Sequence, residues 1–166
     1  MNRRQLLIQI GRLFAGAAAL SLAGPSLAAA ALKKSKAEWR ALLPKESYAV
    51  LFEEATERPG SSPLNAEKRT GTYVCAACNQ PLFNSAQKFE SGTGWPSFFD
   101  VLPKAVEKRT DYKMILPRTE YHCARCGGHQ GHVFDDGPKP TGLRYCNNGV
   151  ALRFVAADSK LPELRA

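Results

Sequence analysis

The segments CAAC, residues 75–78, and CARC, residues 123–126, decide how this chain folds. In each segment two cysteines lie three positions apart, so a single tight turn can direct both sulfurs at one point. Two such turns supply four thiolates, the tetrahedral ligand set that Zn²⁺ prefers in closed structural sites. We therefore expect Cys75, Cys78, Cys123 and Cys126 to bind one structural zinc ion. An ion held in this way joins distant parts of the chain and stabilises a small fold.

Two disulfides are the alternative use of these four cysteines, because an exported protein could form them. A disulfide within either CxxC turn would be strained or redox-active, and crossed disulfides would not need the repeated spacing. The spacing favours zinc. The fifth cysteine, Cys146, is then left free.

The segments around the cysteines predict a mostly antiparallel β domain. Short apolar runs alternate with turn residues over residues 71–155, a pattern typical of strands joined by tight turns. We expect strands at residues 71–75, 114–116, 120–123 and 150–155.

A small helical arm precedes the β domain. Ser35 and Glu38 fit a capping box, which predicts a short helix that carries Trp39 and ends before Pro44. Pro44 can occupy the first turn of a second helix, with Tyr48, Leu51 and Phe52 along one side. The segment GSSP, residues 60–63, ends this arm. We therefore divide the chain into a leader (1–30), a helical arm (31–60) and a β domain with the zinc site (61–166).

The leader has the features of an export signal. Arg3 and Arg4 precede an apolar run at residues 13–23, and small residues follow, with cleavage expected near Ala28 or Ala30. The paired arginines and the weakly apolar run resemble a twin-arginine signal, which predicts a periplasmic protein. An ordinary secretory signal and an uncleaved membrane anchor are the alternatives, although the run is short for a membrane span.

Composition indicates one globular domain. The chain has 166 residues, of which 44% are hydrophobic and 23% are charged. Its net charge of +8 falls to +5 without the leader, because three arginines and no acidic residue lie in the first thirty positions. The basic residues are scattered, so we expect no nucleic-acid binding.

Cys146 is a candidate nucleophile. In a strand, Arg144 and Cys146 would lie on the same face, where the guanidinium would favour the thiolate. The alternative is a small buried hydrophobic cysteine. His129 and His132 are not needed by a four-cysteine zinc site and could donate a hydrogen bond or a proton, although many histidines are structural. We assign the structural role to His122, which precedes a zinc ligand.

The segment SGTGWPSF, residues 91–98, predicts an unusual backbone around two aromatic side chains. Trp95 could form an aromatic wall for a small apolar group. A turn that buries its aromatic side chains in the core is the alternative.

Together these motifs resemble the B-type methionine sulfoxide reductases, which reduce methionine-R-sulfoxide. The resemblance covers roughly residues 36 to 155. The matching motifs are Cys75-x-x-Cys78, Ser91-Gly-Thr-Gly-Trp-Pro-Ser-Phe98, Cys123-x-x-Cys126, His129-x-Gly-His-Val-Phe134 and Asp136-Gly-Pro-x-Pro-Thr-Gly-x-Arg-Tyr-Cys146. The resemblance implies a mainly β fold of two antiparallel β-sheets with short N-terminal helices and a structural zinc.

The resemblance also implies the chemistry. Cys146, as the thiolate, would attack the sulfoxide sulfur and become a sulfenic acid while methionine is released. Trp95 and Phe134 would bind the substrate, and Trp95 would pack against its methyl group. His129 and His132 would hold and protonate the sulfoxide oxygen. The remaining implied roles are thiolate stabilisation by Arg144, orientation of the polar cluster by Asp136, and a hydrogen bond near the reacting atoms from Asn148.

The chain departs from the family pattern at three positions. Many members have a resolving cysteine where this chain has Thr93, so we expect an external thiol, from a thioredoxin-like protein or a small dithiol, to reduce the sulfenic acid. Gln130 and Asn147 replace residues that are usually apolar, which predicts a more polar pocket rim.

We expect the substrate to be oxidised protein, with free methionine sulfoxide as a second substrate. The mature protein is expected to be a monomer without stable membrane insertion. Two other classes stay open: a zinc-ribbon-like binding module, which would leave Cys146 unexplained, and a different thiol enzyme such as a peroxidase.

Overall fold

The structure, a computed structural model of the chain, describes residue 32 and residues 34–166. The predicted leader and its cleavage site lie outside these residues. Within the described part of the chain, no helix is both long enough and apolar enough to cross a membrane. The elements are α1 (Lys36–Leu42), α2 (Lys45–Glu53), η1 (Pro63–Asn65), β1 (Gly71–Cys75), β2 (Pro81–Asn84), η2 (Ser85–Gln87), β3 (Lys88–Phe89), β4 (Ser97–Phe98), β5 (Val106–Asp111), β6 (Arg118–Cys123), β7 (His129–Phe134), β8 (Arg144–Asn147), η3 (Gly149–Ala151) and β9 (Leu152–Ala156).

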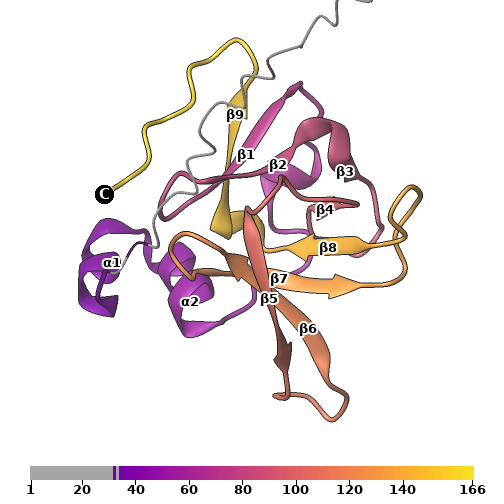
Figure 1. Cartoon of the computed structure of the whole chain (residues 1–166), viewed down its shortest axis with the longest axis horizontal. Helices are drawn as coiled ribbons and strands as arrows, with labels where there is room; N and C mark the ends of the chain where they lie inside the picture. The colour runs from indigo at the N-terminus through magenta and orange to yellow at the C-terminus, as the bar shows by residue number, and fades with distance from the viewer. Residues whose placement is uncertain (1–31, 33) are drawn as a thin grey trace, which may run out of the picture.

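The strands form two antiparallel sheets, which confirms the predicted fold class. The smaller sheet has the order β2-β1-β9, and the larger has the order β3-β4-β8-β7-β6-β5. Figure 1 shows the smaller sheet above the larger one, with both helices to one side. The β5–β6 hairpin extends away from the rest of the molecule at the lower end of the same view.

The helical arm forms as its sequence predicts. Ser35 and Glu38 make both hydrogen bonds of the capping box, with the Ser35 amide 2.8 Å from the Glu38 carboxylate. The Trp39 ring stacks on Phe52 of α2 with centroids 5.2 Å apart, and this contact fixes α1 against α2. Pro44 caps α2 from the position before its first residue, one place earlier than predicted. The arm packs into the main hydrophobic core through Trp39 and Leu51.

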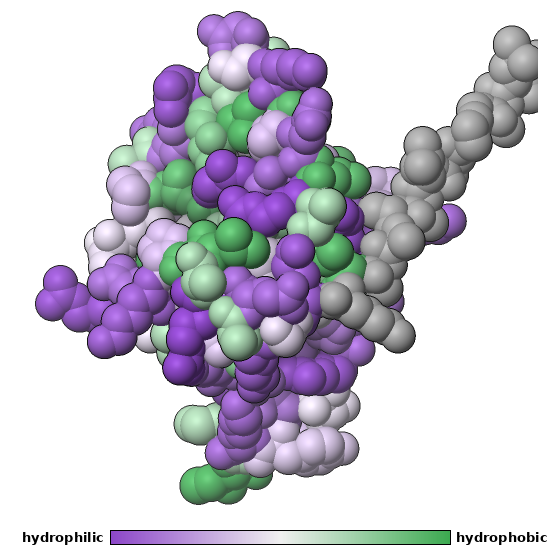
Figure 2. Space-filling view, turned by 90° about the vertical axis from the view of Figure 1, so that its left-hand side faces the viewer, coloured by the Kyte–Doolittle hydropathy of each residue, from purple (hydrophilic) through white to green (hydrophobic). Residues whose placement is uncertain are grey.

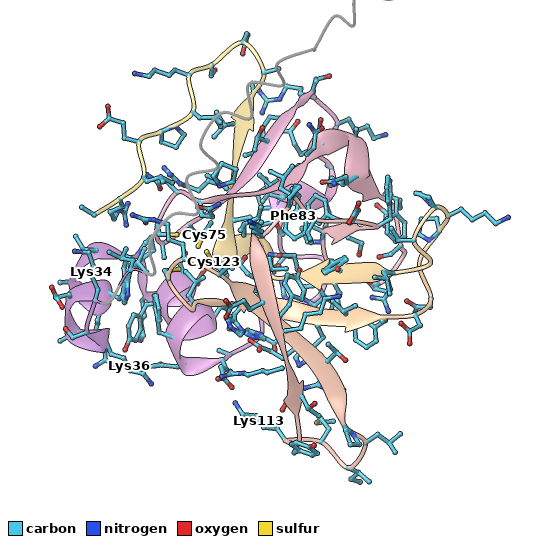
Figure 3. The ribbon with its side chains drawn as sticks, viewed as in Figure 1. Lys34, Lys36, Cys75, Phe83, Lys113 and Cys123 are labelled. Atoms are coloured by element: carbon cyan, nitrogen blue, oxygen red, sulfur yellow. The ribbon has the colours of Figure 1, made fainter. Side chains whose placement is uncertain are left out.

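Aromatic side chains fill the space between the two sheets. Phe83 of the small sheet stacks on Phe98 of the large sheet with centroids 4.0 Å apart. Tyr121 of β6 and Tyr145 of β8 lie on the same face of the large sheet, and their rings meet edge to face with centroids 5.2 Å apart. Figure 3 shows Phe83 in the interior of the molecule. Because this face of the large sheet is apolar, the alternation of side chains along each strand leaves its other face for polar groups.

The prediction of a strand at residues 114–116 is wrong. These residues form the turn between β5 and β6, with the Ile115 side chain fully exposed. The strand in this part of the chain is β5, whose sequence VEKRTD has little apolar character because most of its side chains face solvent. The prediction for residues 150–155 is confirmed from Leu152 onward, while the residues before it form η3.

Candidate active site

The two CxxC segments adopt the same turn. In the first, Asn79 donates its amide hydrogen to the Cys75 carbonyl at 3.0 Å, and in the second Gly127 donates to the Cys123 carbonyl at 2.8 Å. Asn79 and Gly127 both have positive φ, 66° and 70°, and these are residue types that adopt this conformation at low cost. The residue after each CxxC therefore allows the turn to close.

The two turns bring four sulfurs to one point. The Sγ atoms of Cys75, Cys78, Cys123 and Cys126 all lie within 4.8 Å of one another. The two measured contacts, Cys75–Cys126 at 3.7 Å and Cys78–Cys123 at 3.6 Å, are too long for disulfides. They match a tetrahedron with metal–sulfur bonds of about 2.3 Å, whose edges are about 3.8 Å. The residues therefore fit a closed four-thiolate metal site, and Figure 3 shows Cys75 and Cys123 side by side near α2.

The fifth cysteine lies on the polar face of the large sheet. Cys146 of β8 is directly opposite His132 of β7, and His132 is opposite Glu120 of β6. Side chains at such opposite positions share a face, so these three form one row across the sheet. Gly131 allows the strands to approach here, because a Cβ at this position would lie 1.9 Å from the Cys146 carbonyl oxygen.

A β-bulge brings His129 to the same face. His129 is opposite His122, while Gly131 is opposite Tyr121, so Gln130 is an extra residue in β7. In a regular strand, residues three positions apart would point to opposite faces. With the bulge, the His129 and His132 rings meet with centroids 5.5 Å apart.

A small pocket surrounds the Cys146 thiol. Its volume is about 130 Å³, and it is lined by Thr56, Trp95, Arg118, Gly131, His132, Phe134, Cys146, Asn147 and Asn148. Trp95 is fixed by a hydrogen bond of 3.2 Å from its indole nitrogen to the Glu57 carbonyl. Glu57 also fixes Asn148, because its amide donates to the Asn148 side chain at 3.0 Å. One loop thus holds two pocket residues.

The electrostatics of Cys146 balance burial against a nearby cation. Burial raises the pKa of the Cys146 thiol, and the Arg144 guanidinium and the Thr93 side chain lower it only in part. Arg144 lies outside the pocket lining, where its guanidinium covers the Phe134 ring at 4.4 Å. Asp136 binds Arg144 through two hydrogen bonds of 2.8 Å. Asp136 therefore positions Arg144, and its own negative charge also raises the pKa of Cys146.

His129 and His132 differ in their surroundings. His132 lines the Cys146 pocket, whereas both histidines line an adjoining cavity of about 560 Å³. Burial lowers the pKa of His132, although a hydrogen bond of 2.8 Å from its Nε2 to Asp111 opposes this effect. His129 is bound through Nδ1 to Glu120 at 2.7 Å. The Nε2 atom of His129 is left for the cavity.

Sequence comparisons agree with this geometry. The family described as SelR domain matches residues 43–156. The chain is 52% identical over 129 residues to "Peptide methionine sulfoxide reductase MsrB" of Methanosarcina barkeri, covering 77% of this chain and 91% of that protein. The chain belongs to the MsrB family. The proteins of the same name from Agrobacterium fabrum and Pseudomonas putida are 52% and 51% identical, covering 74% and 76% of this chain and 92% and 96% of those proteins.

One expectation for this MsrB-family site is wrong. Gln130 and Asn147 were expected at a polar pocket rim, but both side chains are fully buried. Gln130 does not line the Cys146 pocket, because the bulge turns its amide toward the metal cluster, 3.5 Å from Cys75 Sγ. Asn147 lies in the inner part of the pocket and accepts a hydrogen bond of 2.7 Å from Tyr121.

Two carboxylates of this MsrB-family chain were missed from its sequence. Glu120 is 2% exposed and binds His129, His122 at 3.2 Å and Arg109 at 2.9 Å. Burial alone would raise the pKa of Glu120, but hydrogen bonds from His122 and His129 outweigh it and lower the pKa to about 2. Glu57 accepts from the backbone amides of Gly149 and Val150 at 2.5 and 3.0 Å. The i, i+2 spacing of Glu120 and His122 in one strand was a local signal for Glu120. Glu57 had no such signal, since the partners of its carboxylate lie more than 90 positions away.

Proposed function

We propose that this protein reduces methionine-R-sulfoxide, in oxidised proteins and as the free amino acid, to methionine. The observation that carries the proposal is the position of Cys146, which shares a small pocket with His132 and Trp95. Trp95 supplies an aromatic surface for the substrate methyl group, as Phe134 does from β7. A nucleophile, a proton donor and an apolar wall within one pocket suit an attack on a small sulfoxide.

The reaction removes one oxygen atom from the substrate. Cys146 sulfur attacks the sulfoxide sulfur and forms a sulfur–sulfur bond, and the sulfur–oxygen bond of the substrate breaks as the oxygen takes up two protons and leaves as water. Water then adds to the Cys146 sulfur and loses a proton, which breaks the sulfur–sulfur bond and releases methionine. The products are methionine and a Cys146 sulfenic acid, so the cysteine is oxidised by two electrons and the substrate is reduced by two. Burial raises the pKa of the Cys146 thiol, and the Arg144 guanidinium opposes part of this cost of forming the attacking thiolate.

The imidazoles act on the sulfoxide oxygen. His132 lies opposite Cys146, and His129 reaches the adjoining cavity through Nε2. Glu120 is an ionised acceptor at neutral pH, so the Nδ1 atom of His129 that binds it carries a hydrogen. This contact fixes the orientation of the ring. Arg144, held by Asp136, favours the thiolate as it forms, and Asn148 hydrogen-bonds near the reacting atoms.

We propose that the four-cysteine site holds Zn²⁺. Four sulfurs at tetrahedral spacing leave no open position for substrate, so the ion has a structural role. Zinc bound there would join β1 and β2 of the small sheet to β6 and β7 of the large sheet.

We propose that an external thiol, from a thioredoxin-like protein or a small dithiol, reduces the Cys146 sulfenic acid. The other four cysteines form the metal cluster, and Thr93 stands where a resolving cysteine is found in many family members. One turnover with the R epimer followed by dimedone should label Cys146. A disulfide between Cys146 and a second cysteine of this chain would contradict the proposal.

The function is tested with the separated R and S epimers of methionine sulfoxide and dithiothreitol as reductant. The expected result is turnover of the R epimer alone, loss of turnover in Cys146→Ser, and one zinc per chain in both proteins. Hydrogen peroxide serves as the competing substrate. Faster turnover of peroxide than of either epimer would identify a peroxidase instead.

We also propose that the protein is exported to the periplasm and works as a monomer after its leader is removed. Support comes from the arginine pair, the apolar run and the small residues that precede Ala31. Cell fractionation and the intact mass of the mature protein test the proposal. A protein that is found in the cytoplasm with residues 1–30 still attached would contradict the proposal.

A further inference from the structure

The turn between β5 and β6 exposes apolar side chains that no packing among the described residues explains. Tyr112, Met114, Ile115 and Leu116 are 76%, 59%, 101% and 76% exposed. Together with Pro117 they form what we call the apolar tip. Figure 1 shows that this hairpin projects from the body of the molecule, and Figure 2 shows hydrophobic residues at its lower end. Contiguous exposed apolar surface is uncommon in soluble proteins and marks sites of interaction.

The apolar tip is continuous with the reaction pocket. A cavity of about 580 Å³ beneath the tip is lined by residues 114–117 together with Val133 and Phe134. Phe134 and Arg118 line both this cavity and the pocket that contains Cys146. A mostly apolar surface, which also includes Arg118, Thr119 and Asp135, therefore leads from the tip to the edge of the site where the chemistry occurs.

The size of the reaction pocket determines what must lie outside it. At about 130 Å³ it has room for the end of one side chain and not for a peptide backbone. When a protein-bound methionine sulfoxide reaches Cys146, its neighbours in the polypeptide must lie against the surface around the opening. The cavity beneath the tip is part of that surface and is mostly apolar.

The chemistry of the substrate identifies the occupant. Methionine is mostly a core residue, so apolar residues surround it in folded proteins. Oxidation to the sulfoxide makes the side chain polar and disrupts such a core. When a segment that carries such a damaged methionine opens locally, apolar residues beside it become accessible together with the sulfoxide.

We propose that the apolar tip and the cavity beneath it bind apolar residues that flank methionine sulfoxide in an unfolded polypeptide. This inference rests on the proposed function and deepens it. The surface selects apolar-flanked substrates over polar-flanked ones and has no effect on free methionine sulfoxide, which has no flanking residues.

The test uses the double variant Ile115→Ser/Leu116→Ser of the zinc-loaded enzyme. The matched control is Leu161→Ser/Leu164→Ser, which replaces two exposed leucines of the C-terminal segment. The substrates are free methionine-R-sulfoxide and two pentapeptides with a central sulfoxide flanked by leucines or by serines. We expect the kcat/KM of the first variant for the leucine peptide to fall about tenfold, mainly through a higher KM. The reason is that the variant lacks two apolar side chains that the bound peptide would bury. Its kcat/KM for free sulfoxide should not change.

Each outcome separates this inference from the proposed function. If the unaltered enzyme does not reduce free R-sulfoxide, the proposed function fails. If it does, and the tip variant keeps the full preference for the leucine peptide, the docking surface is refuted. Sedimentation at equal concentrations and binding to anionic lipid vesicles test two other occupants. The inference would also be overturned if the unaltered protein formed a dimer or bound vesicles, the tip variant did neither, and the tip variant still preferred the leucine peptide.

Discussion

Replacement of Glu120 by glutamine tests the central claim about how the site is organised. Glu120 accepts hydrogen bonds from His129 at 2.7 Å and from Arg109 at 2.9 Å, and it is 2% exposed. Glutamine has nearly the same shape but only one oxygen, and its NH₂ group must take the place of the second. Arg109 cannot accept a hydrogen bond, so the amide oxygen can satisfy either Arg109 or His129 but not both.

The magnitude follows from this conflict. If the amide oxygen turns to Arg109, the NH₂ group faces His129 and the proton of that ring must move from Nδ1 to Nε2. If it turns the other way, the NH₂ group at this buried position faces the Arg109 Nε hydrogen and finds no acceptor there, while the Arg109 side chain itself is 53% exposed. An unsatisfied buried donor costs about 1–3 kcal/mol. Felt entirely in the transition state, this cost lowers kcat by about 5- to 150-fold, because a factor of ten corresponds to about 1.4 kcal/mol.

The assay is steady-state reduction of the R epimer by zinc-loaded Glu120→Gln. The matched control is Glu107→Gln, since Glu107 is a β5 carboxylate that lies 3.5 Å from His122 and is 68% exposed. We expect the control to stay within about twofold of the unaltered enzyme, as exposed ion pairs contribute little. A folded, zinc-loaded Glu120→Gln enzyme with unchanged kcat would refute the claim that Glu120 orients His129.

Three further changes have defined outcomes. Cys123→Ser leaves three thiolates and should lose both zinc and cooperative thermal unfolding, because structural zinc contributes about 10–16 kcal/mol. Chelator titration measures the bound metal and circular dichroism follows the unfolding; metal retained by the variant would contradict the prediction. Trp95→Ala should raise KM for the R epimer more than Trp95→Phe does, because phenylalanine keeps an aromatic wall; equal kinetics would contradict this role. The pKa of Glu120 is lowered from 4.5 to about 2, so its contribution to stability is complete above pH 4.5 and is lost as the pH falls toward 2. As the pH falls from 4.5 toward 2, the free energy of unfolding measured in urea should therefore fall more steeply in the unaltered protein than in Glu120→Gln. Parallel plots of this free energy against pH would contradict the prediction.

The predictable parts of the molecule depend on local rules. The capping box of Ser35 and Glu38 specifies a helix start within four residues. Each CxxC segment carries its own turn, and the residue after it, Asn79 or Gly127, tolerates positive φ. The metal site was predictable because each half is encoded by a few consecutive residues.

The parts that escaped prediction depend on pairing between distant segments. β5 has no apolar alternation, and only its backbone pairing with β6 makes it a strand. The apolar residues 114–116 resemble a strand but form the hairpin turn. Glu57 has an ordinary loop sequence, and its importance comes from hydrogen bonds to residues more than 90 positions away.

The bulge at Gln130 links the four-cysteine site to the segment that carries Cys146. The Gln130 side chain donates to Cys75 Sγ at 3.5 Å, and its carbonyl accepts from the Asn148 amide at 2.9 Å. One residue therefore joins a metal ligand to the segment that follows Cys146. The same extra residue turns His129 onto the face that carries His132. If zinc is bound at the four cysteines, its loss would leave the Cys75 sulfur less firmly held, and we expect the Gln130 bulge and the His129 ring to be less constrained while Cys146 itself stays chemically intact.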